Sequence, residues 1–269
     1  GRLLTFFAFG ASSGAFAMLM QTSWNDVFWS TLLGMLVCLF TFWAERSKRV
    51  TDMLEPISAL TSAFLASAIA LIDPSINIPL VILSSIIAFI PGLALTLGLS
   101  ELAARNLMSG TARIMDAVMI LFKIYFGGVL GIALGKMLWG EVVFIEPPHT
   151  PNWTLWAAVT TLSISLVILF KCRKKDAPWG IISGYVAFGA SMVGSQYLGV
   201  ALGAFVGAFA LGIYSNLFSR IMNLPSSIVK LLGLVVLVPG SKVYMGLSNA
   251  VSGQTMLNAT DIGSQAFLI

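Results

Sequence analysis

A few charged residues stand inside or beside long apolar stretches of this 269-residue sequence, and these residues are the ones that can do chemistry. Lys123 has three apolar or aromatic residues on either side, and Arg113 and Asp116 precede it on the same predicted helix. Glu101 comes before that helix, and Lys242 lies late in the chain. Arginine and lysine donate hydrogen bonds to a substrate carboxylate, and a carboxyl group whose environment shifts its pKa can load and unload a proton. The pattern indicates carboxylate binding and proton handling.

Sequence spacing predicts how these charges pair. Glu101 and Arg105 are four residues apart, and Arg113 and Asp116 are three apart, so each pair can meet on a helix. Asp116 lies two turns before Lys123 and is the nearest partner predicted for it. A cation within hydrocarbon costs about 2.5–3.5 kcal/mol, so we expect Lys123 to be paired or to face a polar cavity. Snorkelling of Lys123 and simple solvation of the other charges are the alternatives.

Two Pro-Gly pairs interrupt apolar segments, at Pro91-Gly92 and at Pro239-Gly240, and Ser241-Lys242 follows the second. Proline lacks a backbone donor and disturbs the preceding helical turn, so each pair predicts a broken helix that faces protein or water. The sequence of residues 8–12 also recurs without change at residues 187–191. Paired broken segments in two halves indicate the substrate site of a transporter. Alternatively, each Pro-Gly pair only kinks its helix, and the repeated residues match by chance.

The elements that position these residues must be membrane helices. The chain is 58% hydrophobic and only 10% charged, with a mean hydropathy of +0.93. Soluble domains carry roughly 25% charged residues, and disordered chains lack such apolar content, so both classes are excluded. The apolar runs do not alternate in polarity, which favours helices over barrel strands. Ten segments are predicted, at residues 3–20, 27–44, 56–72, 77–99, 112–139, 153–170, 180–198, 200–218, 226–240 and 255–269.

The predicted fold is therefore an all-α polytopic membrane protein with about nine or ten transmembrane helices in two related halves, residues 1–140 and 141–269. Basic clusters at 45–49 and 171–175 contrast with connections at 21–26 and 140–152 that contain no Lys or Arg. The positive-inside rule places the basic connections and the N-terminus in the cytoplasm. The net charge of +4 is then a signal of topology, and no nucleic-acid partner is predicted.

Enzyme and cofactor signatures are absent from the sequence. His149 is the single histidine, so neither a metal-binding His pair nor a serine-nucleophile motif with a usable base can be built, and there is no phosphate-binding loop. Cys38 and Cys172 are too few for a disulfide framework. We predict no enzymatic activity, no cofactor and no metal. Because the chain begins at Gly1 and ends within an apolar run, we expect a piece of a longer protein.

The stretch from Ile90 to Thr96, with Glu101-Leu102 and Ser109-Gly110-Thr111-Ala112-Arg113 after it, resembles the threonine/serine exporter family. Val238-Pro239-Gly240, preceded by a Gly-rich span, is similar to that family's second half. The resemblance implies about ten helices in two halves, and amino-acid efflux driven by the proton-motive force across a bacterial inner (plasma) membrane. Ser241-Lys242 departs from the apolar or small pair usual there and leaves the substrate open, because two-subunit versions of the family are associated with dicarboxylates.

We therefore predict a secondary exporter of small hydrophilic amino acids, threonine or serine, driven by proton antiport. The alternatives are a dicarboxylate (succinate-like) exporter and a passive channel or membrane scaffold subunit. The predicted partners are the lipid bilayer, protons, and a small polar amino acid or dicarboxylate, and a homo-oligomer is left open. The predicted substrate-binding or coupling residues are Pro91, Gly92, Thr96, Glu101, Arg113, Asp116, Lys123, Pro239, Gly240, Ser241 and Lys242.

Overall fold

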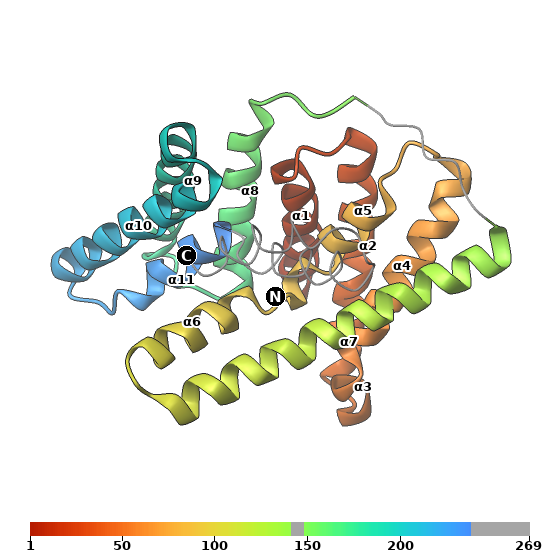
Figure 1. The fold of residues 1–269 in the computed structure, drawn as a ribbon, viewed down its shortest axis with the longest axis horizontal. Helices are drawn as coiled ribbons and strands as arrows, with labels where there is room; N and C mark the ends of the chain where they lie inside the picture. Colours follow the sequence, from red (N-terminus) through yellow and green to blue (C-terminus); the bar gives the residue numbers. More distant parts are fainter. Residues whose placement is uncertain (141–147, 238–269) are drawn as a thin grey trace. The chain divides into compact units, whose positions relative to one another are not determined.

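The computed structural model describes residues 1–140 and 148–237, and the regular structure of this part of the chain is entirely helical (Figure 1). The all-α prediction is confirmed for these residues. In chain order the elements are α1 (Arg2–Leu19), α2 (Trp24–Ala44), α3 (Lys48–Asp52), α4 (Leu54–Ile72), α5 (Ile78–Ser85), the 3-10 turn η1 (Ile87–Phe89), α6 (Gly92–Ala103), α7 (Leu107–Trp139), α8 (Thr154–Leu169), α9 (Ala177–Leu198), α10 (Val200–Met222) and α11 (Ser227–Val236).

Five of these helices are long and apolar enough to cross a membrane, or six when the bent pair of α5 and α6 is taken as one span. The helices α8 and α11 are shorter but also apolar. Each of the first nine predicted segments overlaps one of these helices, or two in the case of 77–99, whereas the tenth, 255–269, lies outside the described residues. The prediction of a polytopic membrane protein is therefore confirmed.

The segment predicted at 77–99 is broken where Pro91 interrupts it. The helix α5 ends at Ser85, η1 adds one tight turn, and α6 begins at Gly92 with Pro91 as its N-cap. Pro91 has φ −81° and ψ 41°, outside the helical range, and it has no N–H to continue the hydrogen-bond ladder. The predicted break is thus present at this proline.

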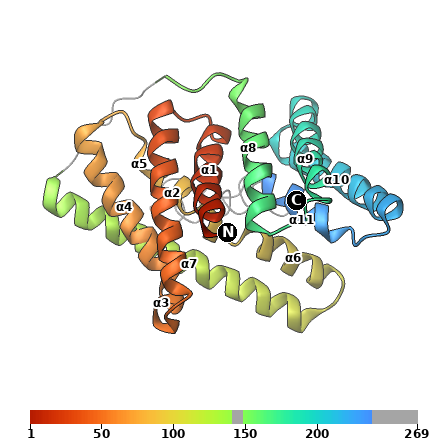
Figure 2. The same ribbon diagram turned by 180° about the vertical axis from the view of Figure 1, so that it is seen from behind.

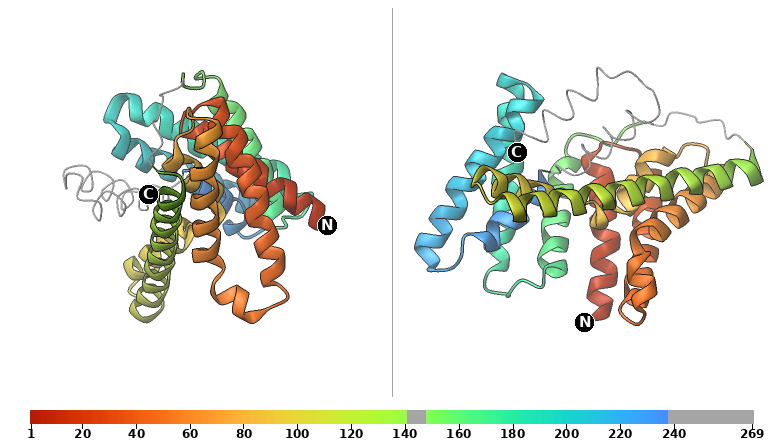
Figure 3. Two further views of the ribbon diagram at one scale, coloured as in Figure 1. Left: turned by 90° about the vertical axis from the view of Figure 1, so that its right-hand side faces the viewer. Right: turned by 60° about the horizontal axis from the view of Figure 1, so that its bottom comes forward.

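The described chain divides into two compact units that do not follow the order of the sequence. Unit 1 contains Gly1–Phe89 and Ile120–Leu169, and unit 2 contains Ile90–Met119 and the chain from Phe170 onward. The helix α7 runs without a break through the boundary at Met119, as Figure 3 shows. It contributes its first turns to unit 2 and the remainder to unit 1. The division into halves at residue 140 stays a prediction.

In unit 1, α1 packs against both α2 and α8, and the three helices stand side by side (Figure 2). Small residues allow this contact, because a Cβ at Gly34 would lie 2.6 Å from the Cβ of Ser13, and one at Gly10 would lie 2.6 Å from Met35 Cγ. Glycine at these positions lets the helix backbones approach closely, as membrane helices require when no hydrophobic effect drives them together.

A second seam in unit 1 joins α4 to the later turns of α7. Gly127, Gly131 and Gly135 face Ala59, Ala63 and Ser67 in turn, each pair separated by 68 residues. Because the difference in residue number is the same for each pair, the two helices run in the same direction. A Cβ at Gly131 would lie 2.4 Å from the Leu60 carbonyl oxygen and 2.6 Å from the Ala63 Cβ, so glycine is required for this approach.

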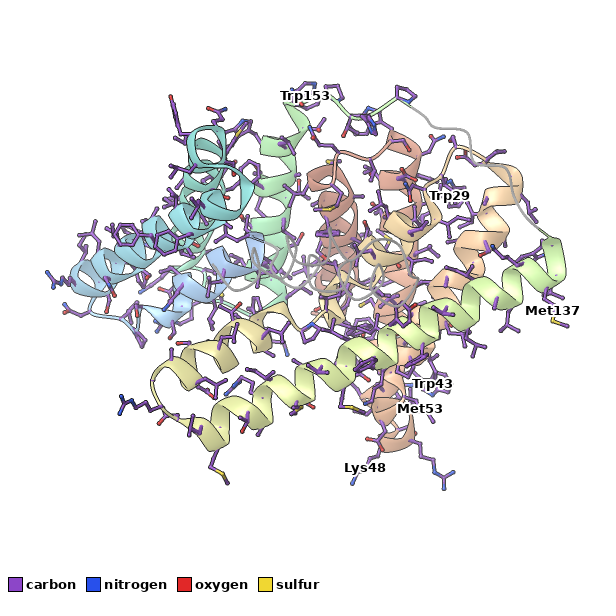
Figure 4. All side chains as sticks on the ribbon, in the orientation of Figure 1. Trp29, Trp43, Lys48, Met53, Met137 and Trp153 are labelled. Atoms are coloured by element: carbon purple, nitrogen blue, oxygen red, sulfur yellow. The ribbon has the colours of Figure 1, made fainter. Side chains whose placement is uncertain are left out.

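The two ends of unit 1 differ in charge. At one end the Thr150 N–H donates to the Thr22 carbonyl (3.1 Å), and Gln21 donates to the Asn152 side chain (2.8 Å). At the other end Arg2 pairs with Glu45 (3.1 Å), near the basic residues that follow α2. Figure 4 shows Trp29 and Trp153 towards the first end, and Trp43 and Lys48 towards the second. The charges of the connecting turns in unit 1 are therefore segregated as the pattern predicts, whereas Lys136, near the end of α7, lies towards the first end.

The turn between α4 and α5, at the end of unit 1 opposite Lys48, is held by two carboxylates. Buried Asp26 accepts from the backbone N–H groups of Asn77 (2.7 Å) and Ser23 (3.1 Å), the second as part of a capping box. Asp73 accepts from Ser75 and from Trp29 Nε1 (3.4 Å). Burial opposes ionisation of Asp73, but the hydrogen bonds from Ser75, Trp29 and Asn25 outweigh it, so its pKa lies below the ordinary 3.8.

In unit 2, α9 and α10 form a hairpin around Gly199, whose φ of 84° is in the region that glycine favours. A Cβ at Gly203 would lie 2.6 Å from the Ser195 backbone nitrogen, so this contact is also close. The outer face of α10 leaves a row of large apolar side chains exposed, namely Phe205, Phe209, Ile213 and Leu217. Such a row is compatible with lipid and unfavourable in water.

We expect Gly131→Ala to destabilise the protein by roughly 1–3 kcal/mol, because the added methyl overpacks the seam between α4 and α7. Gly212→Ala is the matched control, since a Cβ at that helical glycine meets nothing within 4 Å. Alanine is the better helix former, so the control keeps or raises the melting temperature. Thermal unfolding in detergent measures both variants. Equal melting temperatures would contradict the close seam.

We expect Asp73→Asn to lower the melting temperature at pH 7 by roughly 2–4 °C, the shift for about 1 kcal/mol. A carboxylate with a depressed pKa stabilises the fold above its unfolded pKa, and this contribution is lost as the pH falls through its folded pKa. The difference from wild type should therefore shrink below about pH 4. Exposed Asp52→Asn is the control. A difference that stays constant down to pH 3 would exclude this role.

Candidate functional site

The broken helix places its first residues inside unit 2. Pro91 and Gly92 are both buried, and the Thr96 hydroxyl donates to the Gly92 carbonyl (3.0 Å). Leu93 packs against a buried cluster formed by Ala187, Leu211, Leu234 and Leu237. The break therefore faces protein, as expected of backbone interrupted within an apolar segment.

The last described residue, Leu237, belongs to that same cluster. Leu93 follows the first Pro-Gly pair directly, and Leu237 stands two residues before the second. The predicted site residues of the second break, Pro239, Gly240, Ser241 and Lys242, lie outside the described residues. Their place in the site stays a prediction.

At the far end of α6, Glu101 is held by two groups from the start of α7. Arg113 Nη2 lies 3.0 Å from Glu101 Oε1, and the Ser109 hydroxyl donates to Glu101 Oε2 (2.7 Å). The tight α6–α7 turn explains this arrangement. A Cβ at Gly98 would lie 2.7 Å from the Ile114 Cγ1, so glycine lets α7 fold back closely along α6. Glu101 is thereby brought beside the second turn of α7.

The predicted Glu101–Arg105 pair is wrong, because the helix ends before Arg105. The helix α6 stops at Ala103, and Arg105 is an exposed turn residue with φ 62°. The i to i+4 rule holds only while both residues are helical. Arg113, which sequence spacing paired with Asp116, instead takes Glu101 as its partner. Asp116 is exposed one turn further along α7.

The Glu101–Arg113 pair is accessible enough to exchange partners. The exposed fraction is 25% for the Glu101 side chain and 42% for that of Arg113. The guanidinium has five N–H donors in a planar fork, and its contact with Glu101 is through Nη2. Arg113 can therefore receive a second carboxylate, or exchange Glu101 for one.

Lys123 has a different partner from the one predicted. Its Nζ lies 3.9 Å from Glu55 Oε2, in the first turn of α4, rather than beside Asp116. The two residues are again 68 positions apart, so the ion pair continues the register of the glycine seam by one turn. Glu55 therefore lies at the end of unit 1 that carries the basic residues. This placement explains how a lysine fits within so apolar a stretch.

Glu55 is the partner of Lys123 that sequence reasoning missed. A glutamate at the start of a helix, just after a charged loop, looks like a solvated residue. The signal that could have found it is the matched spacing of Gly127, Gly131 and Gly135 with Ala59, Ala63 and Ser67, which extends to Glu55 and Lys123. That match requires a parallel α4–α7 pair, which the sequence alone does not show.

No group of three or more His, Cys, Asp or Glu residues in the described part of the chain is arranged to hold a metal ion. His149 is exposed in its loop, and its Nδ1 lies 3.0 Å from the Gln21 carbonyl oxygen. The candidate site in unit 2 is thus described by the broken helix and the Glu101–Arg113 pair, and the Glu55–Lys123 pair belongs to unit 1.

The comparisons with known proteins cover nearly the whole chain. A family model for threonine/serine exporters matches residues 1–135, and a second model for the same exporters matches residues 154–269. The chain belongs to the threonine/serine exporter family. The resemblance noted from the Pro91 to Arg113 region is thereby confirmed.

The relatives of this exporter-family chain include fungal and bacterial proteins. The threonine/serine exporter of Corynebacterium glutamicum is 25% identical over 190 residues, which cover 68% of this chain and 38% of that protein. Pheromone-regulated membrane protein 10 of Eremothecium gossypii is 28% identical over 247 residues, covering 88% of this chain and 31% of that protein. The chain spans about a third of the length of the first fungal relatives, 30–35% in three of them. No solved structure matches the chain.

Proposed function

We propose that this protein exports small hydrophilic amino acids, with threonine and serine as the leading substrates. Membership of the exporter family supports the proposal most directly. The bacterial relative named as a threonine/serine exporter supports the same substrate class. The Arg113–Glu101 pair supports it chemically, because every amino acid presents a carboxylate that suits a guanidinium fork.

In the proposed mechanism Arg113 alternates between two carboxylates. With no substrate it pairs with Glu101, whose other oxygen accepts from Ser109. The amino-acid carboxylate displaces Glu101 from the guanidinium, and the residues that follow Pro91-Gly92, among them Thr96, line the path of the substrate. The sequence predicts the same role for Lys123 and Lys242. That prediction rests on the sequence alone, and Lys123 pairs with Glu55 in unit 1.

We further propose that a proton gradient drives export, with Glu101 or Asp116 as the proton-carrying group. Antiport requires that the proton and the substrate bind in turn and not together. Ionised Glu101, displaced from Arg113 by the substrate carboxylate, can hold the substrate ammonium, whereas protonated Glu101 cannot. Asp116 is exposed one turn beyond Arg113 and is the second candidate. In this scheme the proton and the substrate therefore exclude each other.

The proposed orientation places the N-terminus and the basic end of unit 1 in the cytoplasm. The charge asymmetry of unit 1 supports it, with Arg2, Glu45 and Lys48 at one end and the turns that lack Lys and Arg at the other. A bacterial inner membrane stays a prediction from the family resemblance, since fungal proteins are prominent among the relatives.

Radiolabelled counterflow in proteoliposomes tests the substrate class. We expect preloaded threonine or serine to accelerate uptake of labelled threonine, whereas succinate does not. A pH gradient, acidic on the side opposite the substrate, should drive accumulation, and a protonophore should abolish it. Competition by succinate would establish the dicarboxylate exporter instead. Transport that follows only the solute gradient would establish a passive channel.

We expect Arg113→Ala to raise the KM for threonine by roughly 10–100-fold, since a hydrogen bond to a charged group contributes about 1.5–3 kcal/mol. Glu101→Gln, Asp116→Asn and Lys123→Ala should each reduce proton-driven efflux. Asp52→Asn, an exposed acid on α3, is the control and should leave efflux at the wild-type rate. Unchanged proton-dependent efflux in all three charge variants would overturn the assigned site.

Cysteine labelling tests the orientation. In a Cys38→Ser, Cys172→Ser background, we expect a cysteine at His149 to react with an impermeant thiol reagent added outside intact cells. A cysteine at exposed Lys48 should react only after the cells are opened. The reverse pattern would invert the proposed topology.

A further inference from the structure

The ion pair between Glu55 and Lys123 has an unusual environment for a membrane helix. The Glu55 Oε2 atom, which faces Lys123 at 3.9 Å, is buried and accepts no hydrogen bond. A buried carboxylate oxygen in this position is stabilised mainly by the nearby ammonium. Loss of charge on either residue therefore removes most of what holds the two together.

Few other charges compete for this pair. The elements packed against α4 are α2, α3, α5 and α7. Of these, α5 carries no ionisable side chain, and α2 carries Asp26 at its other end and Cys38 within its span. The short helix α3 carries Lys48, Arg49 and Asp52, all exposed, and the unit 1 part of α7 also contributes Tyr125 and Lys136. Among the described residues, Lys123 is the cation within ion-pair distance of Glu55.

The pair stands at the end of the α4–α7 seam where α4 begins. Beyond Glu55 and Lys123, the contact consists of glycine against alanine or serine at Gly127, Gly131 and Gly135, and of a ring contact between Phe64 and Trp139 (centroids 4.8 Å apart) towards the opposite end. The Ser67 hydroxyl donates to the Ala63 carbonyl of its own helix and not to α7. Contacts of this kind hold two helices by close packing and dispersion.

We propose that Glu55 is a proton-sensitive positioning residue that closes the α4–α7 seam through Lys123. When the Glu55 carboxylate is ionised, it holds Lys123 and the seam is closed. When the carboxylate takes up a proton, the attraction is lost, Lys123 turns towards water and α7 separates from α4. Glu55 is then a coupling residue for the export reaction, and this role rests on the proposed function. It acts through Lys123 and does not contact the substrate.

The seam can be followed without any substrate. In a background of Cys38→Ser and Cys172→Ser, Ser67→Cys places a thiol against Gly135, inside the seam. Ser163→Cys is the matched control, because Ser163 is buried in the same unit on α8, outside the seam. The measured quantity is the N-ethylmaleimide labelling rate of Ser67→Cys divided by that of Ser163→Cys, which cancels the pH dependence of the thiol itself.

We expect this ratio to rise at least fivefold between pH 8 and pH 4, a range that includes the ordinary protonation of a carboxyl group. With Glu55→Gln the ratio should be high at pH 8 and independent of pH, and Lys123→Gln should behave in the same way. The exchanged pair, Glu55→Lys with Lys123→Glu, should restore a low ratio at pH 8. A ratio that is flat with pH in the chain that keeps Glu55, or a pH response that survives in Glu55→Gln, would overturn the proposal.

Transport separates this proposal from the proposed function. Threonine counterflow by the wild-type protein tests the proposed function alone. If counterflow is absent, the labelling experiment still tests whether Glu55 controls the contact between α4 and α7. If counterflow is present, Glu55→Gln should lose at least tenfold in the stimulation of efflux by a pH gradient, with a flattened pH profile. A wild-type pH profile in Glu55→Gln would remove Glu55 from coupling while leaving the exporter assignment intact.

Discussion

The arrangement of this protein depends on how closely its helices can approach one another. In lipid each helix satisfies its own backbone hydrogen bonds, and there is no water to expel between helices, so association relies on close packing. Glycine meets that need at Gly34 between α1 and α2, at Gly131 between α4 and α7, and at Gly203 between α9 and α10. In the described residues these contacts determine which side chains meet, and therefore where the few charges find partners.

The helix α7 shows how much follows from this constraint. One glycine contact, at Gly98, folds the start of α7 against α6 and brings Arg113 to Glu101. A second set, centred on Gly131, aligns its later turns with α4 and brings Lys123 to Glu55. Arg113 and Lys123 of this continuous helix are thus each neutralised by a carboxylate from a different helix.

The broken helix at Pro91 has a related role. Interrupted backbone is tolerated in a membrane only where protein or water surrounds it, and the break lies against the buried cluster that contains Leu211 and Leu237. The short α6 that follows is long enough to carry Thr96 and Glu101 on consecutive turns, and it ends before Arg105. The break therefore starts a short helix that carries Thr96 in its first half and Glu101 near its end, beside the α6–α7 turn.

The sequence by itself determined the helical membrane fold, the helix positions, the charge asymmetry of the two ends and the break at Pro91, because these follow from local composition and from the chemistry of proline. It also carried the family motif between Pro91 and Arg113. Only the tertiary structure decided the pairing of charges. Spacing along one helix paired Glu101 with Arg105 and Lys123 with Asp116, whereas the folded chain pairs them with Arg113 and Glu55. The reason is physical: an ion pair between helices depends on which glycine faces bring backbones together, and that choice is made by the packing of the whole unit.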